Sequence, residues 1–275
     1  MDTVLVTGGS GRIGSGIVRH LNDHGYRTVS VDVTSGPGEA DDFIEADVTD
    51  AGEVYGAFAR ADPDGVAHMG AIPNAGRHPD HVVYESNAMG AYHVLDAASA
   101  LDVESICMAS SIQAMGIVPP IEVAYLPVDE AHPLAPMDPY ELGKQTVETL
   151  ADGFARRPGA PTTISTFRFP LVIEDEEIRE RFPEGDGTVE SLPQSSRNHL
   201  FAYATIGDVA ALARRALEAD FEGHERFWAS AADNRTTVES RDIADRFYPD
   251  AEIRGNLEGY DPLIDTSKAR DLLGW

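Results

Sequence analysis

The stretch TVLVTGGSGRIG at residues 3–14 decides the fold of this chain. Residues 3–7 are apolar or β-branched, which is typical of a buried strand. Four glycines follow within residues 8–14, and then apolar residues at helical spacing over residues 17–21. In this order of strand, loop and helix, Gly8 permits a tight turn, Gly11 lets backbone approach a pyrophosphate, and Gly14 allows close helix–strand packing. The stretch therefore predicts a dinucleotide site at a helix N-terminus, where unpaired N–H groups favour phosphate.

The second predicted strand, residues 28–32, ends in an acid 18 residues after Gly14. A carboxylate at that place accepts hydrogen bonds from the ribose hydroxyls and repels a 2′-phosphate. Asp32 therefore predicts NAD rather than NADP as the cofactor. Two readings oppose this: Arg12 is able to reach a phosphate, and in so acidic a chain Asp32 is also explicable as ordinary surface charge.

Strand-like and helix-like segments alternate along the chain, which predicts an α/β fold with a doubly wound parallel sheet of the Rossmann type. Ligands in such sheets bind beyond the carboxyl ends of the strands. Further strands are predicted at residues 43–45, 65–68, 105–109, 163–168 and 227–229, and helices at residues 51–60, 80–101, 140–154 and 209–219.

The part of the chain after the strand at 163–168 is short, and some of it returns to the sheet through a turn at 203–208. We therefore expect only a small C-terminal substrate-binding lobe. The predicted division places residues 1–172 plus 201–229 in an NAD-binding Rossmann domain, and residues 173–200 plus 230–275 in the lobe.

The stretch DPYELGK at residues 138–144 carries the chemistry. Tyr140 and Lys144 are four residues apart, so they share one face of the predicted helix. An ammonium beside a phenol favours the phenolate, and we expect it to lower the pKa of Tyr140 and make this residue an acid/base. The alternative is a solvated helix face, although only one other lysine, Lys268, occurs in the chain.

The 47 acidic and 21 basic residues give a net charge of −26. Such a field repels nucleic acid and anionic membrane surfaces, so we expect neither as a partner. Few lysines among many acids indicate a halophilic protein in a high-salt cytoplasm, where salt screens the self-repulsion. No signal peptide or run of membrane-spanning length is evident.

The single cysteine, Cys107, fits a reducing compartment and lies in an apolar stretch, so we expect it to be buried and inert. The histidine pairs do not predict a metal site. His20 and His24 share a helix face but lack a third ligand, and His78 and His81 lie in a loop-like stretch.

Together these motifs resemble those of an extended short-chain dehydrogenase/reductase of the NAD-dependent epimerase/dehydratase group. The resemblance covers nearly the whole length. It rests on the loop at 7–14, Asp32, the pair Asp47-Val48, the segment 68–71, Asn87, Ser110-Ser111, Tyr140 with Lys144, the segment 167–170, and the closing segment 265–275.

The resemblance implies roles for these residues. Tyr140 would be the catalytic base or acid, Lys144 would lower its pKa and hold the nicotinamide ribose, and Ser111 would bind the reacting oxygen. It also implies a homodimer that packs the helices at 80–101 and 140–154 together. The cofactor-binding residues that it implies are Gly8, Gly11, Arg12, Ile13, Gly14, Asp32, Asp47, Val48, Gly70, Ala71, Asn87, Tyr140, Lys144 and Phe169.

The substrate is inferred from departures within the family. Ile112-Gln113 follow Ser111 where 4,6-dehydratases carry an Asp-Glu pair, and the predicted lobe is small for a nucleotide sugar. We therefore expect an NAD-dependent oxidoreductase that oxidises a small sugar, sugar acid or sugar phosphate at C1 to the lactone. The alternatives are a nucleotide-sugar epimerase with tightly bound NAD and, from another class, a non-catalytic NAD(H)-sensing protein.

Candidate substrate residues are fewer and weaker. Asn74, Ile112, Gln113 and Arg168 are expected to face the pocket. Arg179, Arg181 and Arg197 are candidates for holding a carboxylate or phosphate, because a guanidinium binds both bidentately. The alternative is that these arginines neutralise nearby acids, which are Glu174, Asp175, Glu176, Glu177, Glu180 and Glu184.

The excess of acids leads to a prediction about salt. We expect the melting temperature to fall as KCl is removed, because salt screens the repulsion among the acidic side chains. Thermal unfolding across a KCl series measures this, and a melting temperature independent of KCl would contradict it.

Overall fold

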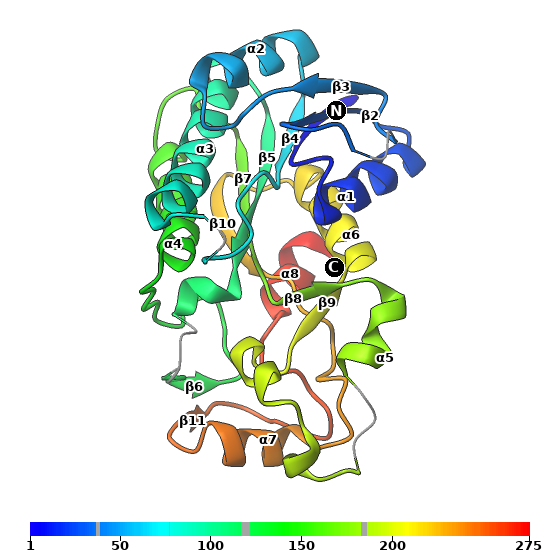
Figure 1. Ribbon diagram of the computed structural model, residues 1–275, viewed down its shortest axis with the longest axis vertical. Coiled ribbons are helices and arrows are strands. Elements are labelled where there is room, and N and C mark those ends of the chain that lie inside the picture. Colours follow the sequence, from blue (N-terminus) through cyan, green and yellow to red (C-terminus); the bar gives the residue numbers. More distant parts are fainter. Residues whose placement is uncertain (37–38, 77, 117–121, 183–185) are drawn as a thin grey trace.

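The computed structural model describes residues 1–36, 39–76, 78–116, 122–182 and 186–275. Its centre is a seven-stranded sheet in the order β10-β7-β5-β4-β1-β2-β3, and all its strand pairs are parallel (Figure 1). The predicted doubly wound parallel sheet is therefore confirmed. These strands are β1 (Thr3–Thr7), β2 (Arg27–Asp32), β3 (Asp42–Glu45), β4 (Gly65–His68), β5 (Ser105–Ser111), β7 (Thr163–Phe169) and β10 (Gly223–Trp228).

Helices cover both faces of the sheet, as Figure 1 shows. One apolar core joins the sheet to α2, α3 and α4, and a second joins its other face to α1, α6 and α8. Each face is therefore sealed from water, which is why the strands are apolar on both sides. The helices are α1 (Arg12–Asp23), α2 (Ala51–Ala61), α3 (Asp80–Ala100), α4 (Pro139–Phe154), α6 (Ile206–Leu217) and α8 (Ser267–Leu273).

One predicted segment is wrong. Residues 203–208 were expected to form a turn before a helix at 209–219, but α6 begins at Ile206, directly after a short strand. Thr205 accepts a hydrogen bond from the backbone N–H of Asp208 (3.0 Å), and Asp208 reciprocates, so this capping box starts the helix earlier. The short strand is β9 (Tyr203–Thr205), which pairs with β8 (Leu171–Ile173).

A third apolar core lies beyond the carboxyl ends of the main strands. The elements around it are short: β6 (Tyr125–Leu126), β11 (Glu252–Ile253), α7 (Ser240–Phe247), and the 3-10 turns η1 (Ile112–Met115), η3 (Val189–Ser191) and η4 (Gln194–His199). The 3-10 turn η2 (Asp175–Glu177) and α5 (Ile178–Arg181) follow β8, and Ile178 packs against a separate small cluster of Ile173, Phe182 and Tyr203. The predicted domain boundaries stay a prediction, and the packing adds two details to them. Val123, Leu126 and Val128 join this third core, whereas Ala269 and Leu273 of α8 pack on the Rossmann side.

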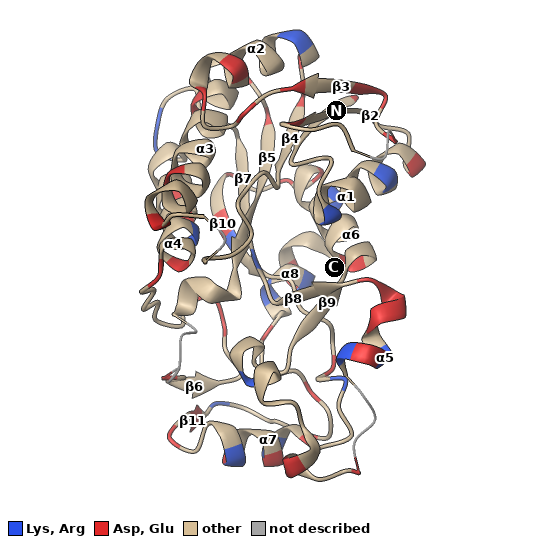
Figure 2. Cartoon of the chain, in the orientation of Figure 1, with Lys and Arg blue, Asp and Glu red and all other residues tan. Residues whose placement is uncertain are grey.

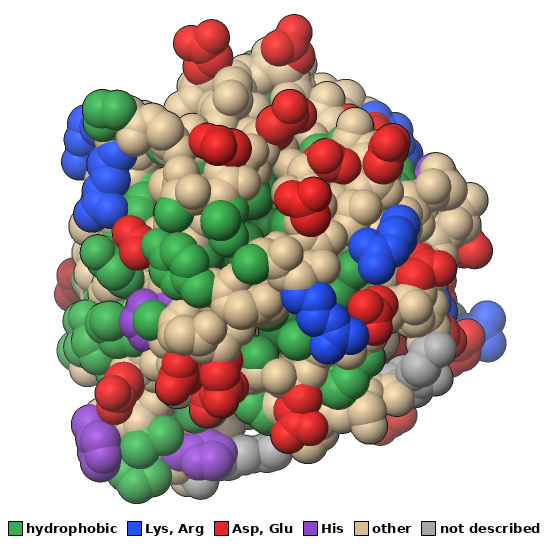
Figure 3. Space-filling model, turned by 90° about the horizontal axis from the view of Figure 1, so that it is seen from above, with side chains coloured by type: hydrophobic (Ala, Val, Ile, Leu, Met, Phe, Trp, Pro, Cys, Tyr) green, Lys and Arg blue, Asp and Glu red, His purple; other side chains and the backbone are tan. Residues whose placement is uncertain are grey.

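Acidic residues are spread over the helices, loops and short elements rather than gathered in one patch (Figure 2). Seen from above, the end that carries α2 and β3 shows scattered Asp and Glu side chains between apolar ones (Figure 3). Within the described ranges, no helix has the length and apolarity needed to cross a membrane.

The glycine loop is tightly packed against its surroundings. Gly8 has a φ of +66°, and a Cβ there would lie 2.6 Å from the backbone nitrogen of Gly70. A Cβ on Gly14 would lie 2.1 Å from the carbonyl oxygen of Gly8. Both positions therefore require glycine, and they bring α1, β1 and the loop after β4 into close contact.

This packing predicts opposite effects for two glycine substitutions. Gly14→Ala forces the loop away from α1 and should lower the free energy of unfolding by about 1–3 kcal/mol. Gly56→Ala lies within α2, where a Cβ meets nothing within 4 Å, so it should stabilise the chain by about 0.5–1 kcal/mol. Urea denaturation measures both, and equal effects would contradict the tight contact at Gly14.

Candidate active site

A cleft of about 740 Å³ opens at the carboxyl ends of the central strands β1, β2 and β4. This is the edge at which doubly wound sheets bind ligands, and the volume is in the range of small-molecule sites. Of the predicted cofactor residues, those that line the cleft are Gly8, Gly11, Asp32, Asp47, Val48, Gly70 and Ala71. Their roles stay predictions, but the fold brings them to one surface.

The chemistry of this cleft suits a dinucleotide. Helix α1 begins here, and its N-cap residue Gly11 has no side chain that could cap the helix. The first backbone N–H groups of α1 therefore suit phosphate oxygens. Asp32, Asp47 and Glu85 place carboxylates along the cleft, and its lining among the described residues contains no lysine or arginine. A 2′-phosphate therefore meets no lining cation within the described part, which favours NAD.

Several predicted cofactor residues lie outside the lining. Arg12 forms an ion pair with Glu177, and this contact disfavours the alternative that Arg12 binds the 2′-phosphate of NADP. Ile13 packs against the core on the α1 side, as does the buried Phe169, while Gly14 packs against Gly8.

Asn87 supports the cleft from behind. Its side-chain Oδ1 accepts a hydrogen bond from the backbone N–H of Ile72 (2.8 Å), and its Nδ2 donates to the carbonyl oxygen of Ile72 (3.1 Å). The amide is therefore committed to the loop after β4, which forms one wall of the cleft. Asn87 also faces Gly143 of α4, where a Cβ would lie 3.0 Å from its own.

Helix α4 starts where the sequence predicts, because its cap is strong. Asp138 accepts a hydrogen bond from the backbone N–H of Glu141 (2.8 Å), Glu141 returns the bond, and Pro139 opens the first turn. This start places Tyr140 and Lys144 inside the protein, 8% and 4% exposed. A side-chain hydrogen bond joins Tyr140 to Ser111, so the structure brings all three predicted catalytic residues together.

The expected pKa of Tyr140 needs a correction. Burial raises the pKa of this phenol, the nearby Asp138 raises it further, and only the hydrogen bond with Ser111 lowers it. Lys144 does not lower it, because its Nζ lies 5.7 Å from the ring centroid and donates to the carbonyl oxygen of Ala109 at 2.8 Å. The prediction of a phenol made acidic by Lys144 is therefore wrong for the chain by itself.

Lys144 is itself perturbed by its surroundings. Burial lowers the pKa of this ammonium from 10.5 to about 8, because a charge away from water is disfavoured. His68, at the end of β4, is also buried, and burial together with the charge of Lys144 lowers its pKa to about 3. His68 is thus a neutral hydrogen-bonding partner for Thr7, whose Oγ1 lies 2.7 Å from its Nδ1.

Two of the predicted substrate residues, Ile112 and Arg168, are buried. Arg168 is only 2% exposed, and its guanidinium is bound to Glu148 at 2.9 Å, so it does not face a pocket. The expectation for Arg168 was wrong because β7 is covered by α4 at this point. Ile112 is buried in the third core, whereas Gln113 and Asn74 are half-buried.

The arginines of the covering segment remain candidates. Arg179 and Arg181 are exposed on α5, and Arg197 lies with its guanidinium 6.0 Å from the ring of Tyr248. Among the described residues, the ion pair formed by the nearby acids joins Glu177 to Arg12 rather than to these arginines. Glu184, named as an alternative partner, lies outside the described residues.

The described residues give little support to a reactive cysteine or a metal site. Cys107 is buried, and burial raises the pKa of its thiol to about 12, so it is an unreactive core residue. No group of three or more His, Cys, Asp or Glu side chains in the described ranges is arranged to hold a metal ion.

Glu148 was missed by sequence reasoning, although its place four residues after Lys144 was a signal for the same helix face.

The sequence profile of the NAD dependent epimerase/dehydratase family matches residues 4–168. The UDP-glucose 4-epimerase of Rhizobium leguminosarum bv. trifolii is 27% identical over 100% of this chain and 92% of its own length. The dTDP-glucose 4,6-dehydratase 1 of Escherichia coli is 32% identical over 59% of this chain and 53% of its own. This chain thus spans about half the length of several curated relatives that it matches.

A solved structure shares the architecture. A mutated uronate dehydrogenase superposes with a TM-score of 0.66 and 22% identity, covering 98% of this chain and 84% of its own. At this identity the likeness shows the fold.

The buried lysine predicts a pH dependence of stability. Because the pKa of Lys144 is about 8 when folded and 10.5 in its ordinary state, the unfolded chain binds more protons between these values, and wild-type stability rises with pH across them. Lys144→Met lacks the buried ammonium, so its free energy of unfolding should exceed that of wild type at the lower end of this window. We expect this difference to shrink by an amount on the order of 3 kcal/mol as pH rises through the window. Urea denaturation of both proteins across the window measures it, and a constant difference would contradict the buried base.

Proposed function

The chain belongs to the NAD-dependent epimerase/dehydratase family, and from this premise we propose that it oxidises a small sugar with NAD. The coarse activity, sugar modification with NAD, follows from the family. The proposed reaction is oxidation at C1 of an aldose, sugar acid or sugar phosphate to its lactone. Its main support is the meeting of Ser111, Tyr140 and Lys144 at the end of β5.

The chain's own residues have defined tasks in this reaction. Bound NAD supplies the acceptor for the hydride that leaves the sugar carbon. The phenolate form of Tyr140 takes the proton of the sugar hydroxyl as that hydride departs, and Ser111 holds the reacting oxygen by a hydrogen bond. Because burial raises the pKa of Tyr140, the phenol is protonated at neutral pH, and oxidation should run faster as pH rises.

Lys144 adds a positive charge within the same buried space. Below about pH 8 it is protonated, so it would favour the negative charge that develops on the sugar oxygen as the proton leaves for Tyr140. We also propose that it binds a ribose hydroxyl of the cofactor. The residues that line the cleft, together with the N-terminus of α1, would hold the rest of the dinucleotide.

A small substrate is supported by the covering part of the chain, whose helices and strands are short. A dehydratase is disfavoured, because Ile112 and Gln113 follow Ser111 and neither carries a carboxyl group. Asn74, Gln113 and Arg179 are the proposed substrate contacts, and the exposed guanidinium of Arg179 suits an anionic sugar.

The second candidate is a nucleotide-sugar epimerase. It is favoured by the relative from Rhizobium leguminosarum, which is a UDP-glucose 4-epimerase and aligns with the whole chain. An epimerase returns the hydride to the same sugar carbon, so NAD stays bound and no net NADH appears.

We further propose a homodimer in a high-salt, reducing cytoplasm. Helices α3 and α4 expose Tyr84, Met89 and Leu142, which are large apolar side chains that a second copy would cover. The single cysteine and the net charge of −26 support the proposed location.

The test is incubation of the protein in high KCl with NAD and a panel of aldoses, uronic acids and sugar phosphates. We expect NADH to appear with one class of sugar, and Tyr140→Phe to abolish it while still binding NAD. NADH absent with every sugar, together with NAD released only on denaturation, would instead support the epimerase.

A further inference from the structure

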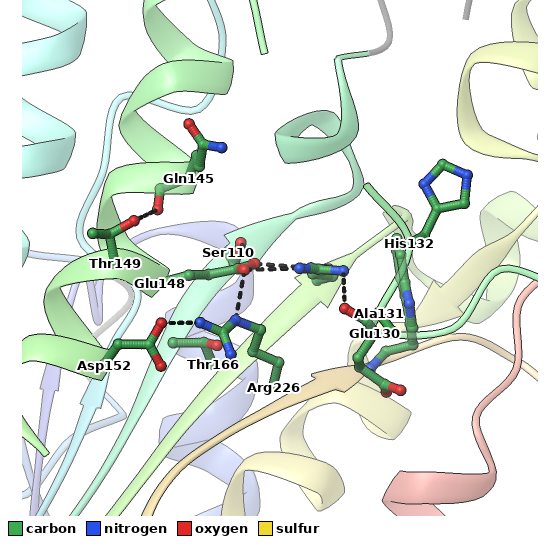
Figure 4. A network of polar contacts seen from close by, with 12 residues as sticks. Ser110, Glu130, Ala131, His132, Gln145, Glu148, Thr149, Asp152, Thr166 and Arg226 are labelled. Carbon is green, nitrogen blue, oxygen red and sulfur yellow. Dashed lines mark hydrogen bonds and ion pairs between the residues drawn. The ribbon is translucent and has the colours of Figure 1, made fainter. Parts of the chain in front are cut away.

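Helix α4 carries a buried carboxylate that the proposed chemistry does not use. Glu148 lies one turn after Lys144 and two turns after Tyr140, and it is 2% exposed. Figure 4 shows its side chain between α4 and the sheet, close to Ser110 and Arg226.

Every oxygen of this carboxylate is engaged. Oε1 accepts hydrogen bonds from Ser110 Oγ (2.7 Å) and Arg168 Nε (2.9 Å). Oε2 accepts from Arg168 Nη2 (2.9 Å) and Arg226 Nε (3.1 Å). Ser110, Arg168 and Arg226 lie on the neighbouring strands β5, β7 and β10, so one side chain ties α4 to three strands.

Arg168 is fixed by further contacts. Its Nη1 donates to the carbonyl oxygen of Glu130 (3.1 Å), and its guanidinium lies 5.5 Å from the ring centroid of Trp228. A buried ion pair contributes little net stability unless its geometry is satisfied, but it specifies one arrangement of the groups around it. The pair of Glu148 with Arg168 meets this condition, since both are 2% exposed and bonded through two parallel contacts.

The contact point on β5 is next to the proposed catalytic serine. Three consecutive residues of β5 are bonded by α4: Ala109 by Lys144, Ser110 by Glu148, and Ser111 by Tyr140. A shift of α4 along the strand would break all three together. The Tyr140–Ser111 bond is a contact between two neutral groups, whereas the Glu148–Arg168 contact is charged, bidentate and buried, and so is the stronger anchor.

We propose that Glu148, held by Arg168, is a positioning residue that keeps α4 in register with the end of β5 and thereby sets Tyr140 against Ser111. The inference rests on the proposed function of Tyr140 as the acid/base. It goes beyond that function by assigning a role to a group that touches neither substrate nor cofactor.

The matched pair of variants is Glu148→Gln and Asp152→Asn. Both change a carboxylate of α4 to an amide and weaken a contact with Arg226, but Asp152 has no bond to β5. For Glu148→Gln we expect kcat of sugar oxidation to fall by about 10- to 100-fold with KM little changed, because a misplacement of about 1 Å costs this much. Asp152→Asn should keep kcat within about twofold of wild type.

A second readout does not need turnover. The groups that act on the phenol of Tyr140 are Ser111, which lowers its pKa, and Asp138, which raises it. If Glu148→Gln releases the bond with Ser111, the pKa of Tyr140 rises. Ultraviolet difference titration against a Tyr140→Phe background measures this shift, and it works even where no sugar is oxidised, so failure of the proposed function and failure of this inference are distinguishable.

Loss of folding is addressed by the double variant E148L/R168M. Removing both partners avoids an uncompensated buried charge, so we expect near wild-type stability in urea with kcat, or the Tyr140 titration, still displaced. Tyr140 titrations unchanged from wild type in both Glu148→Gln and the double variant would overturn the proposal. So would equal losses in Glu148→Gln and Asp152→Asn.

Discussion

The contact between α4 and the end of β5 is the constraint on which the rest of the site depends. Lys144 reaches the carbonyl oxygen of Ala109, and Glu148 reaches the hydroxyl of Ser110, so the helix is held at two successive residues of one strand. Parallel strands end at one edge, and a helix fixed there presents its first turn to the ligand side. Tyr140 lies in that first turn, which the capping box at Asp138 starts.

Holding the helix this way places charges where water does not reach. The ammonium of Lys144 is buried, and burial lowers its pKa to about 8. Glu148 shows the opposite balance: burial acts to raise the pKa of its carboxyl, but the bonds from Arg168, Ser110 and Arg226 bring it below its usual range. The pKa of Lys144 is thus shifted toward neutral pH, whereas the charge of Glu148 is compensated by its hydrogen-bond partners. The first property suits a reactive group, and the second suits an anchoring group.

The cleft is shaped by close backbone packing, and carboxylates are among the side chains that line it. Glycines bring α1 and the loop after β4 close to β1, and a Cβ at Gly8 would strike the backbone of Gly70. Asn87 then holds Ile72 through both ends of its amide, which fixes one wall of the cleft without occupying it. Carboxylates line the cleft in a chain whose net charge is −26, so among the residues that the structure describes the backbone N–H groups at the start of α1 are the groups suited to a phosphate.

The sequence by itself determined the parallel sheet, the glycine loop, and the placement of Ser111 and of the helix with Tyr140 and Lys144 at one edge of the sheet. These follow from local patterns, since strand ends and helix spacing assign residues to edges and faces. Only the tertiary structure decided that Arg168 is buried against Glu148, that α6 begins at Ile206, and that the pKa of Tyr140 is raised. Burial and ion pairing depend on which elements pack together, and residues 20 positions apart, such as Glu148 and Arg168, carry no local signal of that contact.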